Sequence, residues 1–182
     1  MAIAPYGVFA LIAKLMSTLG LSSILPLAKY FFLLASVLIF HGVVTYMTLL
    51  KTMTGLNPVM FIKKMRAAQL FAFSTSSSAA TIPVTMEAVT KRLGVNNSVA
   101  SFSVPLGATI NMDGTAILQG IATVFIAQVY MIDLTLPQYL TVILTAVLAS
   151  IGTAGTPGVG LITLTLVLNQ VGLPVEGIAL II

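Results

Sequence analysis

The chain has 182 residues, of which 58% are hydrophobic and only 7% are charged, and its mean hydropathy is +1.11. Because soluble globular domains carry about 25% charged residues, this composition excludes a soluble domain and predicts an integral membrane protein. The eight Lys and Arg flank apolar segments, which indicates membrane topology rather than nucleic-acid binding, and the absence of cysteine excludes disulfides and thiol chemistry.

The first quarter of the chain is almost continuously apolar. Residues 8–19 continue a run that begins at the first residue, and they have the composition of the inside of a helix. Residues 24–50 would reach roughly 40 Å as a helix, which is enough to cross a hydrocarbon core of about 30 Å. A turn-rich break follows, and then an amphipathic piece with Lys63, Lys64 and Arg66 that we expect at the membrane surface.

The next apolar stretch, residues 67–89, is interrupted by a run of serine and threonine at residues 74–78. The interruption leaves two halves that are too short to cross a membrane alone. Basic residues flank the stretch on both sides, at Arg66 and at Lys91 and Arg92, so the positive-inside rule places both ends on the cytoplasmic face. The sequence therefore predicts a re-entrant helical hairpin over about residues 57–92.

The second half of the chain repeats this order with the opposite orientation. A long span over about residues 98–131 precedes an apolar stretch, residues 140–168, that is broken by the glycine-rich segment 152–160. Acidic residues flank it, which predicts a second re-entrant hairpin, about 137–171, from the opposite face. Residues 175–182 then begin another apolar helix. Two oppositely oriented copies of one unit are typical of secondary transporters, and we expect an all-α fragment of such a protein.

The pentapeptide Asn111-Met112-Asp113-Gly114-Thr115 carries the most specific chemistry. An acid at membrane depth is costly unless it is paired or solvated, so Asp113 is a functional-site candidate. A helix break at Gly114 would free backbone carbonyls to join Asp113 and Asn111 around a hard cation such as sodium. The alternative is a structural role for Asp113, such as a pair with an unseen Lys.

Three other features have a functional and a structural interpretation. Hydroxyls and helix-end amides at a hairpin tip, residues 74–78, suit an anionic carboxylate, but such hydroxyls also bond to carbonyls one turn earlier. The glycine-rich segment 152–160 is predicted to be a gate rather than a mere flexible loop. His41 receives no functional assignment, and Gln119 is expected to hydrogen-bond a neighbouring helix.

Three motifs together resemble one transporter family. They are Ser74-Thr75-Ser76-Ser77-Ser78 with Thr81-Ile82-Pro83, then Pro105 through Thr115, then Ala149 through Gly158. In this order they are similar to the dicarboxylate/amino acid:cation symporters, the family of excitatory glutamate transporters and archaeal aspartate transporters. The resemblance covers all 182 residues, from the end of the family's fifth helix to the start of its eighth, as part of one symporter domain.

The resemblance implies two sets of site residues. The substrate set comprises Ser76, Ser77, Ser78, Thr115, Thr156, Pro157, Gly158, Val159 and Gly160. The sodium set comprises Gly107, Thr109, Asn111, Met112, Asp113, Ser150, Ile151 and Thr153. Chemistry alone assigns Met112 to packing, whereas the family pattern makes it a sodium ligand and favours sodium over protons.

The function that the resemblance implies is sodium-coupled symport of glutamate, aspartate or related dicarboxylates by an elevator mechanism. No prosthetic cofactor is expected, and sodium is the coupling ion. The expected partners are a small-molecule substrate, the lipid bilayer and, for the full-length protein, two further copies in a homotrimer of the inner cell membrane; no nucleic acid is expected. The alternatives are a proton-coupled C4-dicarboxylate or neutral amino acid symporter of the same family, an ion channel, and an intramembrane serine hydrolase with His41 as base.

Overall fold

The computed structural model describes Phe9 and residues 24–181, and every regular element within that part is helical. The helix expected over residues 8–19 lies outside the described residues apart from Phe9. The first described helix, α2 (Ile24–Phe40), continues through a π-helical segment (His41–Thr45) into α3 (Tyr46–Thr54). Residues 25–54 form 30 residues of helix that are long and apolar enough to cross a membrane. The helix predicted over residues 24–50 is therefore present, and its length and composition suit a membrane span.

The segment predicted as the first hairpin folds into a pair of helices. Asn57 starts α4 (Pro58–Thr75), because its side chain accepts hydrogen bonds from the first-turn amides of Val59 and Met60. α5 (Ser78–Glu87) follows, and a π-helical segment (Ala88–Arg92) extends it. A small core holds the pair together; its buried members are Met65, Ala68 and Ala88.

The break between α4 and α5 is shorter than the polar run that predicts it. α4 continues through Ser74 and Thr75, whose hydroxyls bond to carbonyls one turn earlier, as the structural interpretation expects. Only Ser76 and Ser77 leave the helix. Ser76 has φ of 49°, a left-handed conformation that non-glycine residues rarely adopt, and it turns the chain toward α5.

A third long element runs through the middle of the molecule and is interrupted once. α6 (Asn97–Ile110) and α7 (Asp113–Val129) flank a break at Asn111 and Met112. The span expected over residues 98–131 is present with one interruption inside the motif that the sequence singles out. The interruption falls at Asn111 and Met112 rather than at Gly114, which lies in the first turn of α7. Met112 N donates to Ile110 O at 3.1 Å instead of to Ala108 O four residues back, so the helical ladder ends there.

The second predicted hairpin is also a helical pair. α8 (Leu136–Ile151) and α9 (Val159–Gln170) are joined by residues 152–158, within the glycine-rich segment. The apolar helix expected over residues 175–182 is a 3₁₀-helix, Val175–Leu180. Its Gly177 packs against Ile126 so closely that a Cβ there would lie 2.5 Å from Ile126 Cγ2.

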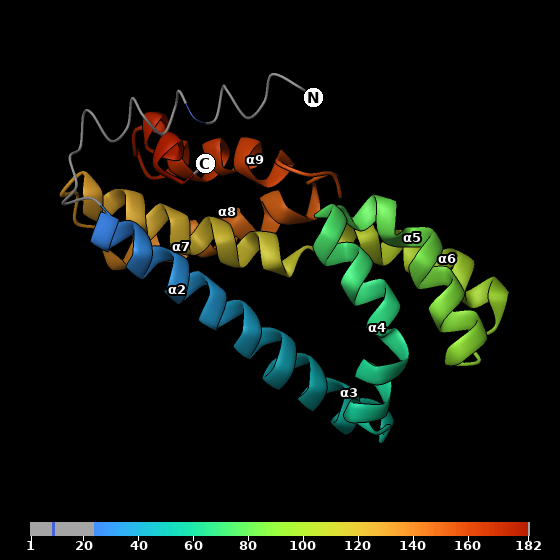
Figure 1. The fold of residues 1–182 in the computed structure, drawn as a ribbon. Coiled ribbons are helices and arrows are strands. Elements are labelled where there is room, and N and C mark those ends of the chain that lie inside the picture. Colours follow the sequence, from blue (N-terminus) through green and yellow to red (C-terminus); the bar gives the residue numbers. More distant parts are fainter. Residues whose placement is uncertain (1–8, 10–23, 182) are drawn as a thin grey trace.

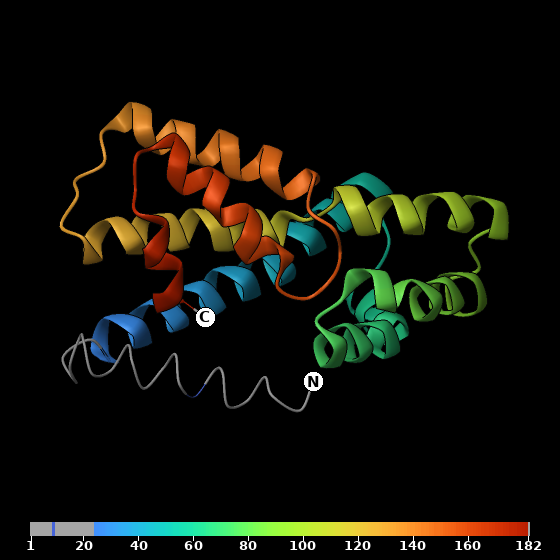
Figure 2. The ribbon, with the colours of Figure 1, turned by 90° about the horizontal axis from the view of Figure 1, so that it is seen from above.

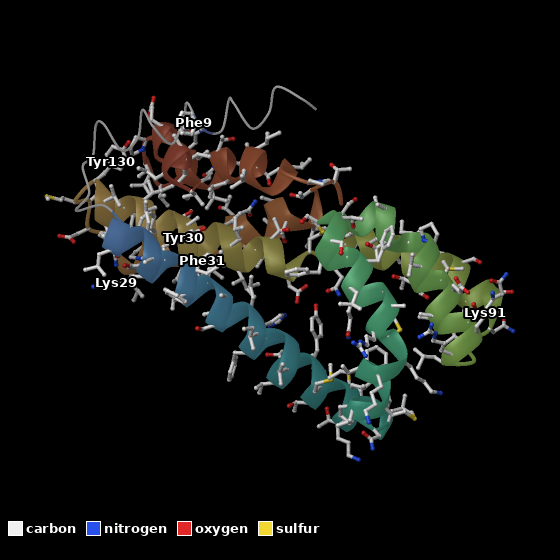
Figure 3. All side chains as sticks on the ribbon, in the orientation of Figure 1. Phe9, Lys29, Tyr30, Phe31, Lys91 and Tyr130 are labelled. Carbon is white, nitrogen blue, oxygen red and sulfur yellow. The ribbon has the colours of Figure 1, made fainter. Side chains whose placement is uncertain are left out.

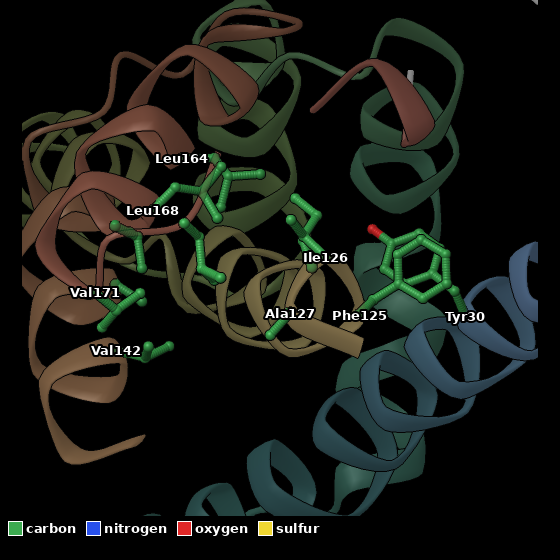
Figure 4. Packing of buried hydrophobic residues seen from close by; sticks show 12 residues of the cluster. Tyr30, Phe125, Ile126, Ala127, Val142, Leu164, Leu168 and Val171 are labelled. Atoms are coloured by element: carbon green, nitrogen blue, oxygen red, sulfur yellow. The ribbon is translucent and has the colours of Figure 1, made fainter. Parts of the chain in front are cut away.

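The main hydrophobic core lies between α2, α7, α8 and α9. Leu164, Val167, Leu168 and Ile126 are fully buried there, and the ring of Tyr30 packs 4.9 Å from that of Phe125 (Figure 4). This core attaches α8 and α9 to α7. The small core of α4 and α5 is separate from it.

The two helical pairs extend from a common centre toward opposite ends of the molecule (Figures 1 and 2). Lys91, near the base of the first pair, and Tyr130, which precedes the second pair, lie at opposite ends (Figure 3). The tips of both pairs lie near the α6–α7 break. This arrangement places the three polar interruptions of the sequence together.

Candidate functional site

The first point of contact is between the tips of the two helical pairs. Ser77 Oγ donates to Gly155 O at 2.8 Å, and Ala79 N donates to the same oxygen at 3.0 Å. Ser77 Oγ also accepts from Ala80 N at 3.1 Å, so one hydroxyl caps α5 and fixes the α8–α9 loop. Ser77 is only 8% exposed, which makes this contact the buried centre of the site.

Gly155 also contacts α6. A Cβ on Gly155 would lie 3.0 Å from Ser78 Cβ and 3.1 Å from Ala108 O. Ala108 O is the carbonyl that the α6–α7 break releases from helical hydrogen bonding, so the break faces the junction of the tips. Three segments that are far apart in the sequence therefore meet at one glycine.

The α6–α7 break holds Asn111 and Asp113 next to two side chains from α2 and α3. His41 Nε2 and Tyr46 OH both hydrogen-bond to Asp113 Oδ2. Asn111 Nδ2 donates to Tyr46 OH at 3.2 Å, so the tyrosine hydroxyl links the two polar residues of the motif. The acid has partners, as the structural interpretation requires, but they are a histidine and a tyrosine rather than a lysine.

These contacts leave oxygen atoms at the break for a cation. Both partners of Asp113 use Oδ2, and Asn111 uses its amide nitrogen, so Asp113 Oδ1 and Asn111 Oδ1 are not taken by these bonds. The break also lies at the C-terminal end of α6, where the partial negative charge of the helix favours cations. Carboxylate, amide and carbonyl oxygens are the ligands that hard cations prefer.

A second polar cluster attaches α9 to α7. Gln119 is fully buried, and its Nε2 donates to Thr163 Oγ1 at 2.7 Å and to Gly160 O at 3.1 Å. The expected hydrogen bond from Gln119 to a neighbouring helix is thus present. Thr153 Oγ1 lies 3.0 Å from Thr163 Oγ1, which extends the network to the α8–α9 loop.

Thr115 lies close to this cluster, in the first turn of α7. A Cβ on Gly160 would be 3.0 Å from Thr115 Cγ2, so the first turn of α9 packs directly on Thr115. Two predicted substrate residues from different helices, Thr115 of α7 and Gly160 of α9, are therefore neighbours. Val159 begins α9, and Thr156, Pro157 and Gly158 lie exposed on the loop before it.

The remaining predicted site residues lie around the junction of the tips and form no single cluster. Ser78 and Gly107 both line a cavity of about 320 Å³ between α4, α5 and α6. Ser76 is exposed at the turn between α4 and α5, and Ile151 is 44% exposed at the end of α8.

Two hydroxyls of the predicted sodium set, those of Ser150 and Thr109, bond within their own helices. Ser150 Oγ donates to Val147 O at 2.8 Å, and Thr109 Oγ1 donates to Leu106 O at 2.9 Å. Met112 is half-buried at the break. α6 contacts α8, but among the described residues no hydrogen bond joins Thr109 or Met112 to Ser150 or Thr153.

Comparison with known proteins assigns the chain to a family. The whole chain, residues 1–182, matches the sequence model of the sodium:dicarboxylate symporter family. The chain belongs to this family. It is therefore part of a membrane transporter and not an enzyme.

Individual relatives agree with the family assignment. The chain is 41% identical to an excitatory amino acid transporter of Caenorhabditis elegans over 180 residues, 98% of the chain and 36% of that transporter. It is 41% identical to excitatory amino acid transporter 1 of Rattus norvegicus over 98% of the chain and 33% of the relative. It is 44% identical to human excitatory amino acid transporter 5 over 80% of the chain and 26% of the relative. The chain spans about a third of the length of the curated relatives that it matches.

The chain also contains site residues that the sequence did not reveal. His41 and Tyr46 contact Asp113 across 72 and 67 positions of sequence. The spacing of His41 and Tyr46 matches no sequence pattern that predicts a site. Both side chains face the Asp113 carboxylate because the helix makes a π-helical turn from His41 to Thr45. The one available signal was a histidine in an otherwise apolar span, which is costly to retain at membrane depth.

Proposed function

We propose that this chain forms the central part of a sodium-coupled symporter for acidic amino acids or related dicarboxylates in the cell's inner membrane. The observation that carries the proposal is the junction at Gly155, where two helical tips meet beside the Asn111 and Asp113 break. Transporters built from inverted repeats bind substrate and ions where broken helices meet near the middle of the bilayer. The names of the relatives, excitatory amino acid transporters, support an acidic amino acid as substrate.

The cation site that we propose centres on Asp113 and Asn111. The donor set fits sodium, because the free oxygens of both side chains lie at the negative end of α6. Tyr46 and His41 fix the orientation of the carboxylate, which reduces the entropy that the site loses when a cation binds. Gly107 would add its carbonyl, and a second sodium ion would use Thr109, Met112, Ser150, Ile151 and Thr153.

The substrate site that we propose lies between the tips. Ser76, Ser77 and Ser78 come from the first tip, Thr115 from α7, and residues 156–160 from the second. The hydroxyls and the N-terminal end of α5 suit a carboxylate group. If sodium and substrate stabilise the same closed state of the second tip, each raises the affinity for the other. An elevator-like movement of this unit, within a trimer of full-length chains, would then carry both across the membrane.

The direct test is uptake of aspartate by the full-length protein in proteoliposomes, with and without an inward sodium gradient. We expect uptake above the equilibrium level only with the sodium gradient. Equal uptake in both conditions would refute sodium coupling, and uptake driven by a proton gradient would favour the proton-coupled alternative. The Asp113→Asn variant in the same assay should show weaker sodium dependence, and unchanged dependence would remove Asp113 from the cation site.

A further inference from the structure

A pocket of about 590 Å³ lies at the base of the first helical pair, away from the junction of the tips. Three basic side chains line it: Lys63 and Lys64 from α4, and Arg92 from the end of the π-helical segment. The other lining residues are Asn57, which caps α4, and Val59 and Met60 in the first turn of that helix. Nothing in the proposed transport site uses these residues.

The structure holds the basic side chains in place through the helices that carry them. The buried core of Met65, Ala68 and Ala88 joins α4 to the π-helical segment, so the backbone at Arg92 is fixed relative to the backbone at Lys63 and Lys64. Lys64 is half-buried, while Lys63 and Arg92 are exposed. The N-terminal end of the 18-residue helix α4 adds partial positive charge to the same pocket.

Among the described residues, no acidic side chain pairs with the cations of the pocket. The chain has only four acidic residues. Glu87 pairs with Lys91 at 3.1 Å, and Asp113 lies at the α6–α7 break with His41. Asp133 follows the C-terminal end of α7, and Glu176 lies in the 3₁₀-helix that packs beside Ile126 near that end. The three cations of the pocket are therefore available to an anionic ligand.

The position of the pocket along the chain places it at the membrane surface. The apolar helix that ends at Thr54 is long enough to span a bilayer, and Asn57 follows three residues later. Val59 and Met60 are 59% and 40% exposed, so apolar side chains lie in the open beside the cations. A ligand that fits must be an anion with an apolar part at headgroup depth.

We propose that the pocket of Lys63, Lys64 and Arg92 beside Val59 and Met60 binds the phosphate headgroup of an anionic phospholipid. The phosphate interacts with the three cations, and an acyl chain covers Val59 and Met60. Basic pockets of membrane proteins at the cytoplasmic surface recognise anionic lipids in this way. The site anchors the base of the first helical pair to the lipid surface, and its existence does not depend on the proposed sodium coupling.

The test is lipid binding to the full-length protein, freed of lipid in detergent and titrated with phosphatidylglycerol or phosphatidylcholine under native mass spectrometry. We expect the wild-type protein to prefer phosphatidylglycerol. The triple variant Lys63→Gln, Lys64→Gln, Arg92→Gln should lose roughly 100-fold in that preference, since each basic residue near an anionic surface is worth about fivefold in affinity. A triple variant that keeps the wild-type preference would overturn the proposal.

Two controls separate the pocket from general charge and from soluble phosphate. The matched variant Lys29→Gln, Lys51→Gln, Lys91→Gln removes three charges outside the pocket and should keep the wild-type preference; loss of the preference in this variant would overturn a specific site. Glycerol 1-phosphate at the same concentration should not displace the lipid, and displacement would identify a soluble phosphate site instead. If the triple variant does not fold, Arg92→Gln alone carries the test, with an expected loss of about fivefold.

Discussion

At the scale of single residues, Tyr46 has an unusual position because one hydroxyl contacts both polar side chains of the α6–α7 break. It donates to Asp113 Oδ2 and accepts from Asn111 Nδ2. Its ring also packs edge-on against His41, with ring centroids 4.9 Å apart. The hydroxyl therefore orders the proposed cation ligands, whereas the ring serves the packing of the helix.

The substitution Tyr46→Phe separates these two roles. Phenylalanine keeps the ring contact with His41 but removes the hydrogen bond to the carboxylate, a type of bond worth about 1.5–3 kcal/mol. We expect a roughly tenfold higher sodium concentration for half-maximal aspartate uptake, and a free energy of unfolding that is lower by at most about 1.5–3 kcal/mol. The control is Tyr139→Phe on α8, away from the break. Unchanged sodium dependence in Tyr46→Phe would show that the tyrosine does not order the cation site.

At the scale of elements, the junction of the tips depends on the absence of a side chain at Gly155. A Cβ there would approach Ser78 Cβ, Ala79 N and Ala108 O at 3.0–3.1 Å, and two of these atoms are backbone that cannot move alone. Gly155→Ala should therefore lower the free energy of unfolding by about 1–3 kcal/mol and reduce uptake, because the tips no longer fit. Thermal unfolding in detergent and uptake by proteoliposomes measure the two effects.

Gly152 provides the matched control for this prediction. It lies in the same loop, and the nearest atom to its Cβ position is Ala149 O at 3.8 Å, an ordinary contact. Gly152→Ala should leave both stability and uptake close to wild type. If Gly155→Ala behaves like Gly152→Ala, the close contact between the tips is not needed for function.

The breaks within the helical pairs are predictable from the sequence, whereas the contacts between them are not. Polar and glycine-rich runs inside apolar spans leave backbone groups that need partners, and such runs predict the two breaks near residues 76 and 155. The contact of Ser77 with Gly155 was not predicted from the residues, because it joins positions 78 residues apart. The π-helical turn at His41 was missed too, since an apolar helix with one extra residue in a turn keeps the same composition.

At the scale of the whole molecule, the two helical pairs extend toward opposite ends (Figure 2), and the hydrogen bond from Ser77 to Gly155 joins them at their tips. α9 has 12 residues and is about 18 Å long, which is much less than the hydrocarbon thickness of about 30 Å. If the bases of the pairs lie on opposite faces of the membrane, the tip contact requires that each pair enters the bilayer and returns. We therefore propose that both pairs are re-entrant hairpins.

The absence of cysteine from the chain makes this topology testable by single-cysteine labelling. Leu56→Cys and Val95→Cys lie at the base of the first pair, and both positions are exposed, at 47% and 36%. Asp133→Cys and Val175→Cys lie at the base of the second pair.

In sealed vesicles of known orientation, we expect a membrane-impermeant maleimide to label Leu56→Cys and Val95→Cys from the cytoplasmic face, because their basic neighbours favour that side. The other two should react only from the opposite face. Labelling of Leu56→Cys and Asp133→Cys from the same face would contradict the proposal. The bases of both pairs would then lie on one face of the membrane, and the two pairs would enter the bilayer side by side.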